Sequence, residues 1–273
     1  YSEAMREKML REQELTEDME PALQSGQFEV WFQPQFDYQN GKMSGAEALV
    51  RWNHPKRGLI SPGEFISLFE KNGRIYELDK YVWEASCRQV SAWRDKNYAP
   101  LTVSVNVSRI DLYDPQLVDH LVSLVQSYAL APERLHLEIT ESAYMDNPEQ
   151  LIDVVCRLHD AGFVVEMDDF GSGYSSLNTL KDVPVDVLKL DVKFLSASIS
   201  DARSSSILGS VIRMASAIDL RVIAEGVEDV MHAQLLHELG CRFMQGYYFS
   251  KPLRPAEMEK MLENATANEA PVR

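Results

Sequence analysis

Polar side chains of the kinds that hold metals or move protons interrupt the apolar runs of this sequence. Seven of the eight runs carry such a group at or near the carboxyl end, namely Glu47, Asn106, Glu138, Asp168 with Asp169, Lys189, Glu225 and Gln245. A single acidic residue of this kind is usually a surface carboxylate. Its recurrence at the same place in successive runs is what indicates a shared site.

Carboxylates gathered at one place need a cation, because like charges raise one another's pKa and burial adds to the cost. Lys189 supplies one positive charge. Hard divalent cations such as Mg2+ or Mn2+, which prefer carboxylate, amide and water oxygens, supply the rest. Two such ions about 3.5–4 Å apart clamp the attacking and leaving oxygens of a phosphoryl displacement. We therefore expect two Mg2+ or Mn2+ ions, bridged by the adjacent Asp168 and Asp169, and a phosphate ester as substrate.

The runs themselves predict the elements that position these groups. Strands are expected at 28–36, 43–50, 101–107, 134–140, 163–168, 186–191, 221–225 and 241–246. A turn-like DYQNGK segment joins the first two as an antiparallel hairpin. Helix-period segments separate the later strands, and one of them opens on a capping-box spacing, Ser61 to Glu64. This alternation predicts an α/β fold, a TIM-like (β/α)8 barrel with an antiparallel first strand, whose catalytic groups gather at the carboxyl ends of the strands.

The two ends of the chain differ from this pattern. Residues 1–23 predict a charged helix, which either caps the domain or links it to an upstream domain and carries a signal; the two interpretations are compatible. The barrel is expected over residues 24–262, and residues 263–273 are expected to be a flexible tail because few of them are apolar. The first residue is Tyr1 rather than Met, so we expect a longer parent protein.

Composition excludes several classes of protein. The 273 residues include 42 Asp and Glu against 27 Lys and Arg, and the formal charge of −15 argues against binding to a nucleic acid polymer. The sequence has no run of about 18 apolar residues that would predict a membrane span. The three cysteines lack disulfide or metal spacing, which favours a reducing, cytoplasmic compartment; membrane anchoring of the parent is left open. The six histidines are scattered and are expected to be structural or exposed.

Ordered motifs in the chain resemble those of the EAL-domain phosphodiesterases, which cleave cyclic di-GMP. They are Gln33-Pro34, Glu47-Ala48-Leu49 followed by Val50-Arg51-Trp52, NVS at 106–108, EITES at 138–142, DDFGSGYSSL at 168–177, PVDVLKLD at 184–191, AEGVE at 224–228 and QGYYFSKP at 245–252. The resemblance covers about residues 24–262. It implies a TIM-like barrel that hydrolyses cyclic di-GMP, a bacterial second messenger, to linear pGpG with two Mg2+ or Mn2+ ions. It also implies a homodimer and an upstream regulatory domain, such as a GGDEF domain, before the linker helix.

The resemblance also assigns roles to individual positions. The metal ligands would be Glu47, Asn106, Glu138, Asp168 and Asp169. Lys189 would hold or activate the attacking water, and Glu225 would assist as a base or by holding that water. Gln245 would orient the site through its amide, and Glu141 would anchor the loop after Asp169. The substrate-binding residues would be Gln33, Glu47, Leu49 and Arg51.

Two positions depart from the family pattern. Ser172 stands where the family loop more often has Thr, and both residues carry a hydroxyl group. Taken from its residues alone, that loop is either an ordinary turn with a helix cap or a mobile lid over the metals. Glu166 stands where a small or apolar residue is usual. Strand alternation puts Glu166 on the same face as Asp168, so we expect it to be buried below the metals and either paired with a base or protonated.

Three functions are open at this point. The first is an active phosphodiesterase, the second a catalytically silent receptor for cyclic di-GMP, and the third an unrelated metal-dependent lyase or phosphatase. Receptor members of the family usually lack the glutamate of the EAL motif, another metal ligand or the loop glutamate. This sequence has all of them: Glu47, the other expected metal ligands and the loop glutamate Glu141. An unrelated barrel would lack the pair Gln33 and Arg51. The sequence therefore favours the enzyme.

Overall fold

The computed structural model describes residues 3–98, 100–170, 181–191 and 202–269. Its strands are β1 (Phe28–Asp37), β2 (Lys42–His54), β3 (Gly58–Ile60), β4 (Val103–Asn106), β5 (Leu135–Thr140), β6 (Val164–Phe170), β7 (Val187–Leu190), β8 (Arg221–Ala224) and β9 (Phe243–Gln245). Its α-helices are α1 (Glu3–Gln24), α2 (Pro62–Lys71), α3 (Ile75–Asp95), α4 (Leu117–Ser127), α5 (Glu141–Asp146), α6 (Pro148–Asp160), α9 (Ala202–Ala217), α10 (Val230–Glu238) and α11 (Pro255–Glu269). Two short 3-10 helices are η1 (Asp111–Tyr113) and η2 (Pro132–Arg134).

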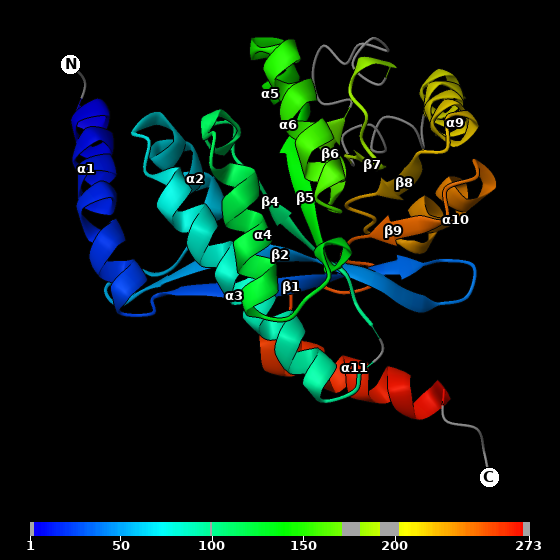
Figure 1. Ribbon diagram of the computed structural model, residues 1–273, viewed down its shortest axis with the longest axis horizontal. Coiled ribbons are helices and arrows are strands. Elements are labelled where there is room, and N and C mark those ends of the chain that lie inside the picture. Colours follow the sequence, from blue (N-terminus) through cyan, green and yellow to red (C-terminus); the bar gives the residue numbers. More distant parts are fainter. Residues whose placement is uncertain (1–2, 99, 171–180, 192–201, 270–273) are drawn as a thin grey trace.

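The strands of the described residues close into a barrel. Their order is β1-β9-β8-β7-β6-β5-β4-β2, and β1 pairs with β2 to complete the circle. Strand β1 is antiparallel to both of its neighbours, whereas the other neighbouring pairs around the circle are parallel. Helices surround the strands, and α11 lies beneath the β1–β2 hairpin (Figure 1). The predicted TIM-like barrel with an antiparallel first strand is confirmed.

The two faces of the parallel strands differ in character. The outward positions, such as Val105, Leu137 and Val165, are apolar and fully buried against the helices. Positions of the other parity face the barrel interior, and several of them are polar and buried, including Ser104, Glu166 and Lys189. Parallel strands are normally covered on both faces and read as continuous apolar runs. The polar residues that interrupt these runs therefore belong to the interior of the barrel.

One strand was not expected from the sequence. The second strand continues to His54, beyond the expected end at Val50, and its last residues pair with β3 in a short antiparallel hairpin. The turn between them begins at Pro55, and Gly58, the first residue of β3, has a φ of 70°. A Pro followed three residues later by a Gly, shortly after an apolar run, is typical of such a turn, so the signal was present in the sequence.

Helix α1 packs on the barrel through α2. Its residues Leu15, Met19 and Ala22 are at most 2% exposed and follow the i, i+4, i+7 spacing of one helix face. Arg11 pairs with Glu64 of α2, and Asp18 lies 3.1 Å from the imidazole of His54. These contacts fit the interpretation of this helix as a cap, while its role in carrying a signal stays a prediction.

Two local expectations are corrected by the structure. Ser61 precedes α2 as its N-cap residue but makes no side-chain capping bond. Glu64, the other half of the expected capping box, is engaged by Arg11 instead, so a tertiary ion pair replaces the local motif. At the other end of the chain, α11 continues to Glu269, and residues 263–269 of the expected tail are therefore helical.

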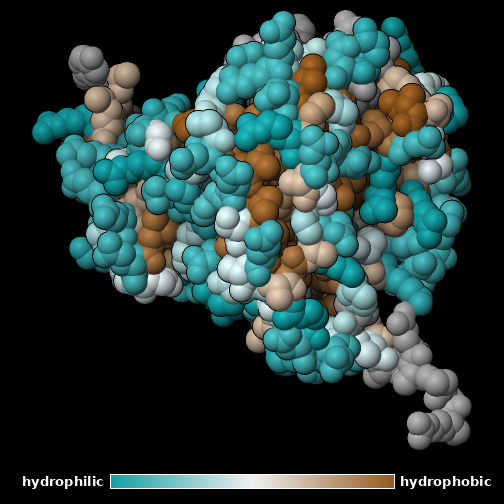
Figure 2. All heavy atoms as spheres, viewed as in Figure 1, coloured by the Kyte–Doolittle hydropathy of each residue, from teal (hydrophilic) through white to brown (hydrophobic). Residues whose placement is uncertain are grey.

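The surface is largely hydrophilic on the face shown in Figure 2, and apolar atoms appear there mostly in the seams between neighbouring helices. Among the described residues, none of the helices has the length and apolar content that crossing a lipid bilayer requires.

Candidate active site

Lys189 stands at the centre of the polar interior. This residue of β7 is fully buried, and its Nζ atom lies within ion-pair distance of four carboxylates. The distances from Nζ are 3.5 Å to Glu47, 2.8 Å to Glu138, 3.5 Å to Asp168 and 2.8 Å to Glu225. Glu47 belongs to β2, which is not a neighbour of β7 in the sheet. Only the closed barrel brings these side chains together, because the contact runs across its interior.

The charges of this cluster do not balance. Burial alone would lower the pKa of the Lys189 ammonium, but the four carboxylates outweigh it and raise that pKa well above its usual value. Burial also raises the pKa of Glu138 well above its usual range, and the neighbouring Glu47 adds to the effect. Glu225 is affected in the same way, first by burial and then by Asp168 and Glu47, against the opposing influence of Lys189. Four carboxyl groups thus share one ammonium. The cluster has more acidic than basic groups, which favours binding of a further cation.

Two amides extend the cluster toward β1. Gln245 at the end of β9 donates from Nε2 to Glu47 Oε2 at 2.5 Å and to Gln33 Oε1 at 3.3 Å. Gln33 in turn donates to the backbone oxygen of Ser250 at 3.2 Å. The amide of Gln245 therefore holds the Glu47 carboxylate in this orientation, and its role in orienting a catalytic site stays a prediction.

The two adjacent aspartates occupy an irregular part of β6. Asp169 has a φ of 58°, in the left-handed region that residues other than glycine seldom adopt. The pairing of β6 with β7 shifts register between Met167 and Phe170, which is a bulge. In a regular strand, neighbouring side chains point to opposite faces. The bulge removes that constraint, so Asp168 and Asp169 can both serve the same rim.

Asn106 and Glu141 complete the predicted set. Asn106 is exposed at the carboxyl end of β4, and its backbone oxygen accepts a hydrogen bond from Trp83 Nε1 at 2.9 Å. Glu141 is buried at the start of α5. The loop over residues 171–177 lies outside the described residues, so its role as a lid and its anchoring by Glu141 stay predictions.

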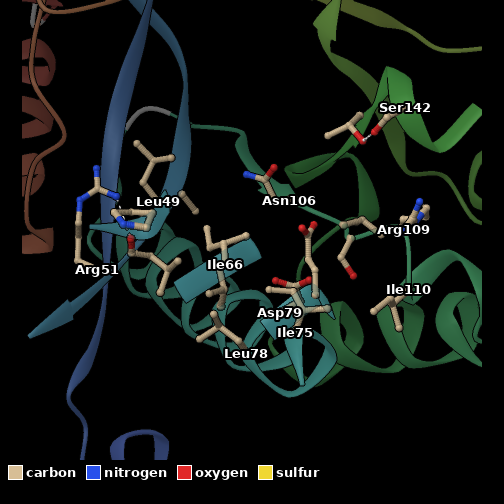
Figure 3. A pocket seen from close by; sticks show the side chains of 18 residues that line it. Leu49, Arg51, Ile66, Ile75, Leu78, Asp79, Asn106, Arg109, Ile110 and Ser142 are labelled. Carbon is tan, nitrogen blue, oxygen red and sulfur yellow. Dashed lines mark hydrogen bonds between the residues drawn. The ribbon is translucent and has the colours of Figure 1, made fainter. Parts of the chain in front are cut away.

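A pocket of about 350 Å³ opens beside the carboxylate cluster. Figure 3 shows Leu49 and Arg51 on one side of it, Arg109 and Ser142 on the other, and Asn106 between them. The guanidinium of Arg51 stacks 5.7 Å from the ring centre of Trp31, and Nη1 donates to the backbone oxygen of Val50 at 2.8 Å. Arg51 is therefore held in place at the mouth of the pocket.

Sequence reasoning missed three groups at this site. Trp31, which supports Arg51, also lies under the guanidinium of Arg254 at 5.2 Å. Asp79 lines the pocket and forms a buried acidic pair with Asp111, and burial together with Asp111 raises the pKa of Asp79 well above its usual range. A signal for Asp79 existed, because it interrupts the apolar face of the helix between Ile75 and Val82.

The donor set fits a hard divalent cation by its chemistry. The carboxylates of Glu47 within β2, of Glu138 in β5 and of Asp168 in β6, and the amide of Asn106 at the end of β4, are oxygen ligands of the kind that Mg2+ and Mn2+ prefer. Among the described residues, however, no group of three or more His, Cys, Asp or Glu side chains is arranged to hold a metal ion. In the structure, four carboxylates face Lys189.

Comparison with known proteins settles the family. A family model described as the EAL domain matches residues 16–252. The chain belongs to the EAL domain family. Within this EAL domain, the Glu47-Ala48-Leu49 signature lies in β2, and its glutamate is one of the four carboxylates around Lys189.

Relatives of this EAL domain are larger signalling proteins. The signaling protein YkoW of Bacillus subtilis is 38% identical over 241 residues, which are 88% of this chain and 30% of YkoW. Cyclic di-GMP phosphodiesterase NbdA of Pseudomonas aeruginosa is 36% identical over 271 residues, which are 99% of this chain and 35% of NbdA. The chain therefore spans about a third of the length of these relatives.

A solved structure has the same fold. The structure described as PaMucR phosphodiesterase in complex with c-di-GMP matches with a TM-score of 0.85 and 34% identity, covering 90% of this chain and 99% of that one. This similarity supports the barrel topology and the family.

Proposed function

We propose that this EAL domain is an active, metal-dependent phosphodiesterase that hydrolyses cyclic di-GMP to linear pGpG and so lowers the concentration of this second messenger. The observation that carries the proposal is the ring of Glu47, Glu138, Asp168 and Glu225 around Lys189, toward the carboxyl ends of the parallel strands β5 to β8. In barrels of this class, that end is where catalysis occurs. The names of NbdA and of the MucR structure support the choice of substrate.

The metal ions would be held by Glu47, Asn106, Glu138, Asp168 and Asp169. When bound, two Mg2+ or Mn2+ ions would lower the pKa of a water molecule and neutralise the charge that develops on the scissile phosphate.

Lys189, Glu225 and Gln245 would have different roles in the reaction. The surrounding carboxylates raise the pKa of Lys189 well above its usual value, so its ammonium is suited to donate hydrogen bonds rather than to act as a base. These hydrogen bonds would hold the attacking water. Glu225, 2.8 Å away and with a raised pKa, is suited to accept a proton from that water. Gln245 keeps Glu47 oriented through its hydrogen bond.

The pocket beside the cluster is suited to one half of the dinucleotide. Arg51 remains charged and presents a fork of donors that matches a phosphate or a guanine edge. Apolar walls from Ile66, Ile75 and Val82 match the flat faces of a purine base. With Gln33 and Leu49 nearby on the hairpin, these groups form the proposed substrate-binding surface.

One observation favours the alternative, a catalytically silent receptor. The four carboxylates of the ring already have a cation beside them, the ammonium of Lys189. A chromatographic assay of cyclic di-GMP with Mg2+, with Mn2+ and with chelator distinguishes the functions. Appearance of pGpG only when metal is present supports the enzyme. Nucleotide binding without turnover would identify a receptor, and turnover of other phosphate esters alone would identify an unrelated hydrolase.

A further inference from the structure

A second polar layer lies in the barrel below the carboxylate cluster. Glu166 in β6 is fully buried, and its Oε1 atom lies 2.5 Å from His136 Nδ1 of β5. The same oxygen accepts a hydrogen bond from Ser104 Oγ of β4 at 3.1 Å. His136 and Ser104 are themselves buried. The expectation that Glu166 is buried and paired with a base is therefore confirmed.

This triad of Ser104, His136 and Glu166 stands directly beneath three proposed metal ligands. Each member precedes one ligand by two residues on the same strand: Ser104 precedes Asn106, His136 precedes Glu138, and Glu166 precedes Asp168. Residues two apart on a strand share a face. The parallel pairing places Ser104 beside His136, and Glu138 beside Glu166. The hydrogen bonds of the triad thus tie together the three strands that carry these ligands.

The triad is not explained by stability alone. Buried polar groups often contribute nothing to stability compared with well-packed apolar side chains, because removing them from water is costly. The second carboxylate oxygen of Glu166, Oε2, is buried without a hydrogen-bond partner among the described residues, which adds to that cost. Because burial of Glu166 costs stability, we look for its role in the carboxylate cluster above it.

We propose that Glu166 is a positioning residue, which through His136 and Ser104 sets the relative placement of Asn106, Glu138 and Asp168 for metal binding. The inference rests on the proposed metal-dependent function and deepens it. Groups that orient metal ligands from behind typically change metal affinity by about 10–100-fold when removed.

The test measures Mn2+ binding directly, as loss of the electron paramagnetic resonance signal of free Mn2+, together with the melting temperature of each variant. Glu166→Ala should weaken Mn2+ binding by about 10-fold or more. Glu166→Gln retains an oxygen acceptor for Ser104 and His136 and should bind Mn2+ nearly as the wild type does. Ser104→Ala, a milder change, should weaken binding by about fivefold, since one hydrogen bond is worth about 1 kcal/mol.

Val165→Ala is the matched control. Val165 is the fully buried neighbour of Glu166 on the opposite, helix-facing side of β6, so its truncation should lower the melting temperature without changing Mn2+ affinity. An equal loss of Mn2+ affinity in Val165→Ala and Glu166→Ala would overturn the proposal, as would unchanged affinity in Glu166→Ala. Equal losses of Mn2+ affinity in Glu166→Gln and Glu166→Ala would also overturn the proposal. The affinity would then depend on the charge of residue 166 and not on its hydrogen bonds. A wild-type chain that binds no Mn2+ would overturn both the metal-dependent function and this inference, whereas wild-type binding with unaltered variants would overturn the inference alone.

Discussion

The Nζ atom of Lys189 lies 2.8 Å from Oε1 of Glu225, on adjacent parallel strands of the barrel. The backbone reinforces this placement, because the amide of Glu225 donates to the backbone oxygen of Leu190 at 2.9 Å. An ammonium and a carboxyl group, both with raised pKa values, are thus held side by side. In the proposed mechanism, Lys189 would hold the water and Glu225 would accept its proton.

Replacing Lys189 should separate catalysis from binding. Lys189→Ala should lower the rate of cyclic di-GMP hydrolysis by about 10²–10⁴-fold, because the donor that holds the attacking water is lost. Binding of the nucleotide, followed by calorimetry, should remain measurable. Lys189→Met, which fills the same space without the charge, should behave alike. Equal loss of binding and turnover would mean that Lys189 is a binding residue.

Replacing Glu47 should abolish turnover. This carboxylate is a proposed metal ligand, and Gln245 orients it. Its loss would remove one oxygen ligand from the proposed metal site. The measurement is pGpG formation by Glu47→Ala at saturating Mg2+. The control is Glu149→Ala, the same substitution at an exposed position on α6, which should leave the activity unchanged. Near-normal activity in Glu47→Ala would reject the assignment of the metal site.

Asp37 should make stability depend on acid pH. Hydrogen bonds from Arg242, at 2.5 and 2.9 Å, lower the pKa of Asp37 below its usual value. A carboxyl group with a lowered folded-state pKa contributes stability above its unfolded pKa, and that contribution is lost as pH falls through the folded value. Asp37→Asn should therefore cost about 1 kcal/mol at pH 7.

The pH series supplies the check on Asp37. Urea unfolding of the wild type and Asp37→Asn should give curves that differ at neutral pH and converge below the pKa of 3.8 that an ordinary Asp has. A difference that stays constant across the whole series would show that the ion pair with Arg242 has no part in it.

The three cysteines should differ in reactivity. Burial raises the pKa values of Cys87 and Cys241 to about 12, so few of their thiols are ionised at neutral pH. Cys156 on α6 is exposed. A thiol reagent at pH 8 should therefore label Cys156 in the native protein and all three after denaturation, as counted by mass spectrometry. Rapid native labelling of Cys87 would indicate that α3 opens readily.

Helix α1 should contribute to the stability of the barrel. Met19→Ala should lower the free energy of unfolding by about 2–4 kcal/mol, because it empties a site that is 2% exposed. Met9→Ala on the same helix, at a position 57% exposed, should change that energy by less than about 0.5 kcal/mol. Urea unfolding measures both. Equal effects would mean that α1 is not docked in solution as it is in the structure.

Periodicity predicted the architecture well because strands and helices are decided by local patterns. All eight expected strands are present, and the DYQNGK turn does join an antiparallel hairpin. One failure lies where a tertiary contact competes with a local one. Glu64 was expected to cap its own helix but pairs with Arg11 of α1, and no local rule could include that distant partner.

The sequence by itself determined which chemical groups this protein has and that they recur at strand ends; barrel closure then follows from strand and helix alternation. Only the tertiary structure decided how those groups share charge. It placed Lys189 among carboxylates from β2, β5, β6 and the end of β8, and it paired Glu166 with His136 below them. The reason is physical, because the pKa values and orientations of buried groups depend on distances across the barrel, and residue order along the chain does not specify those distances.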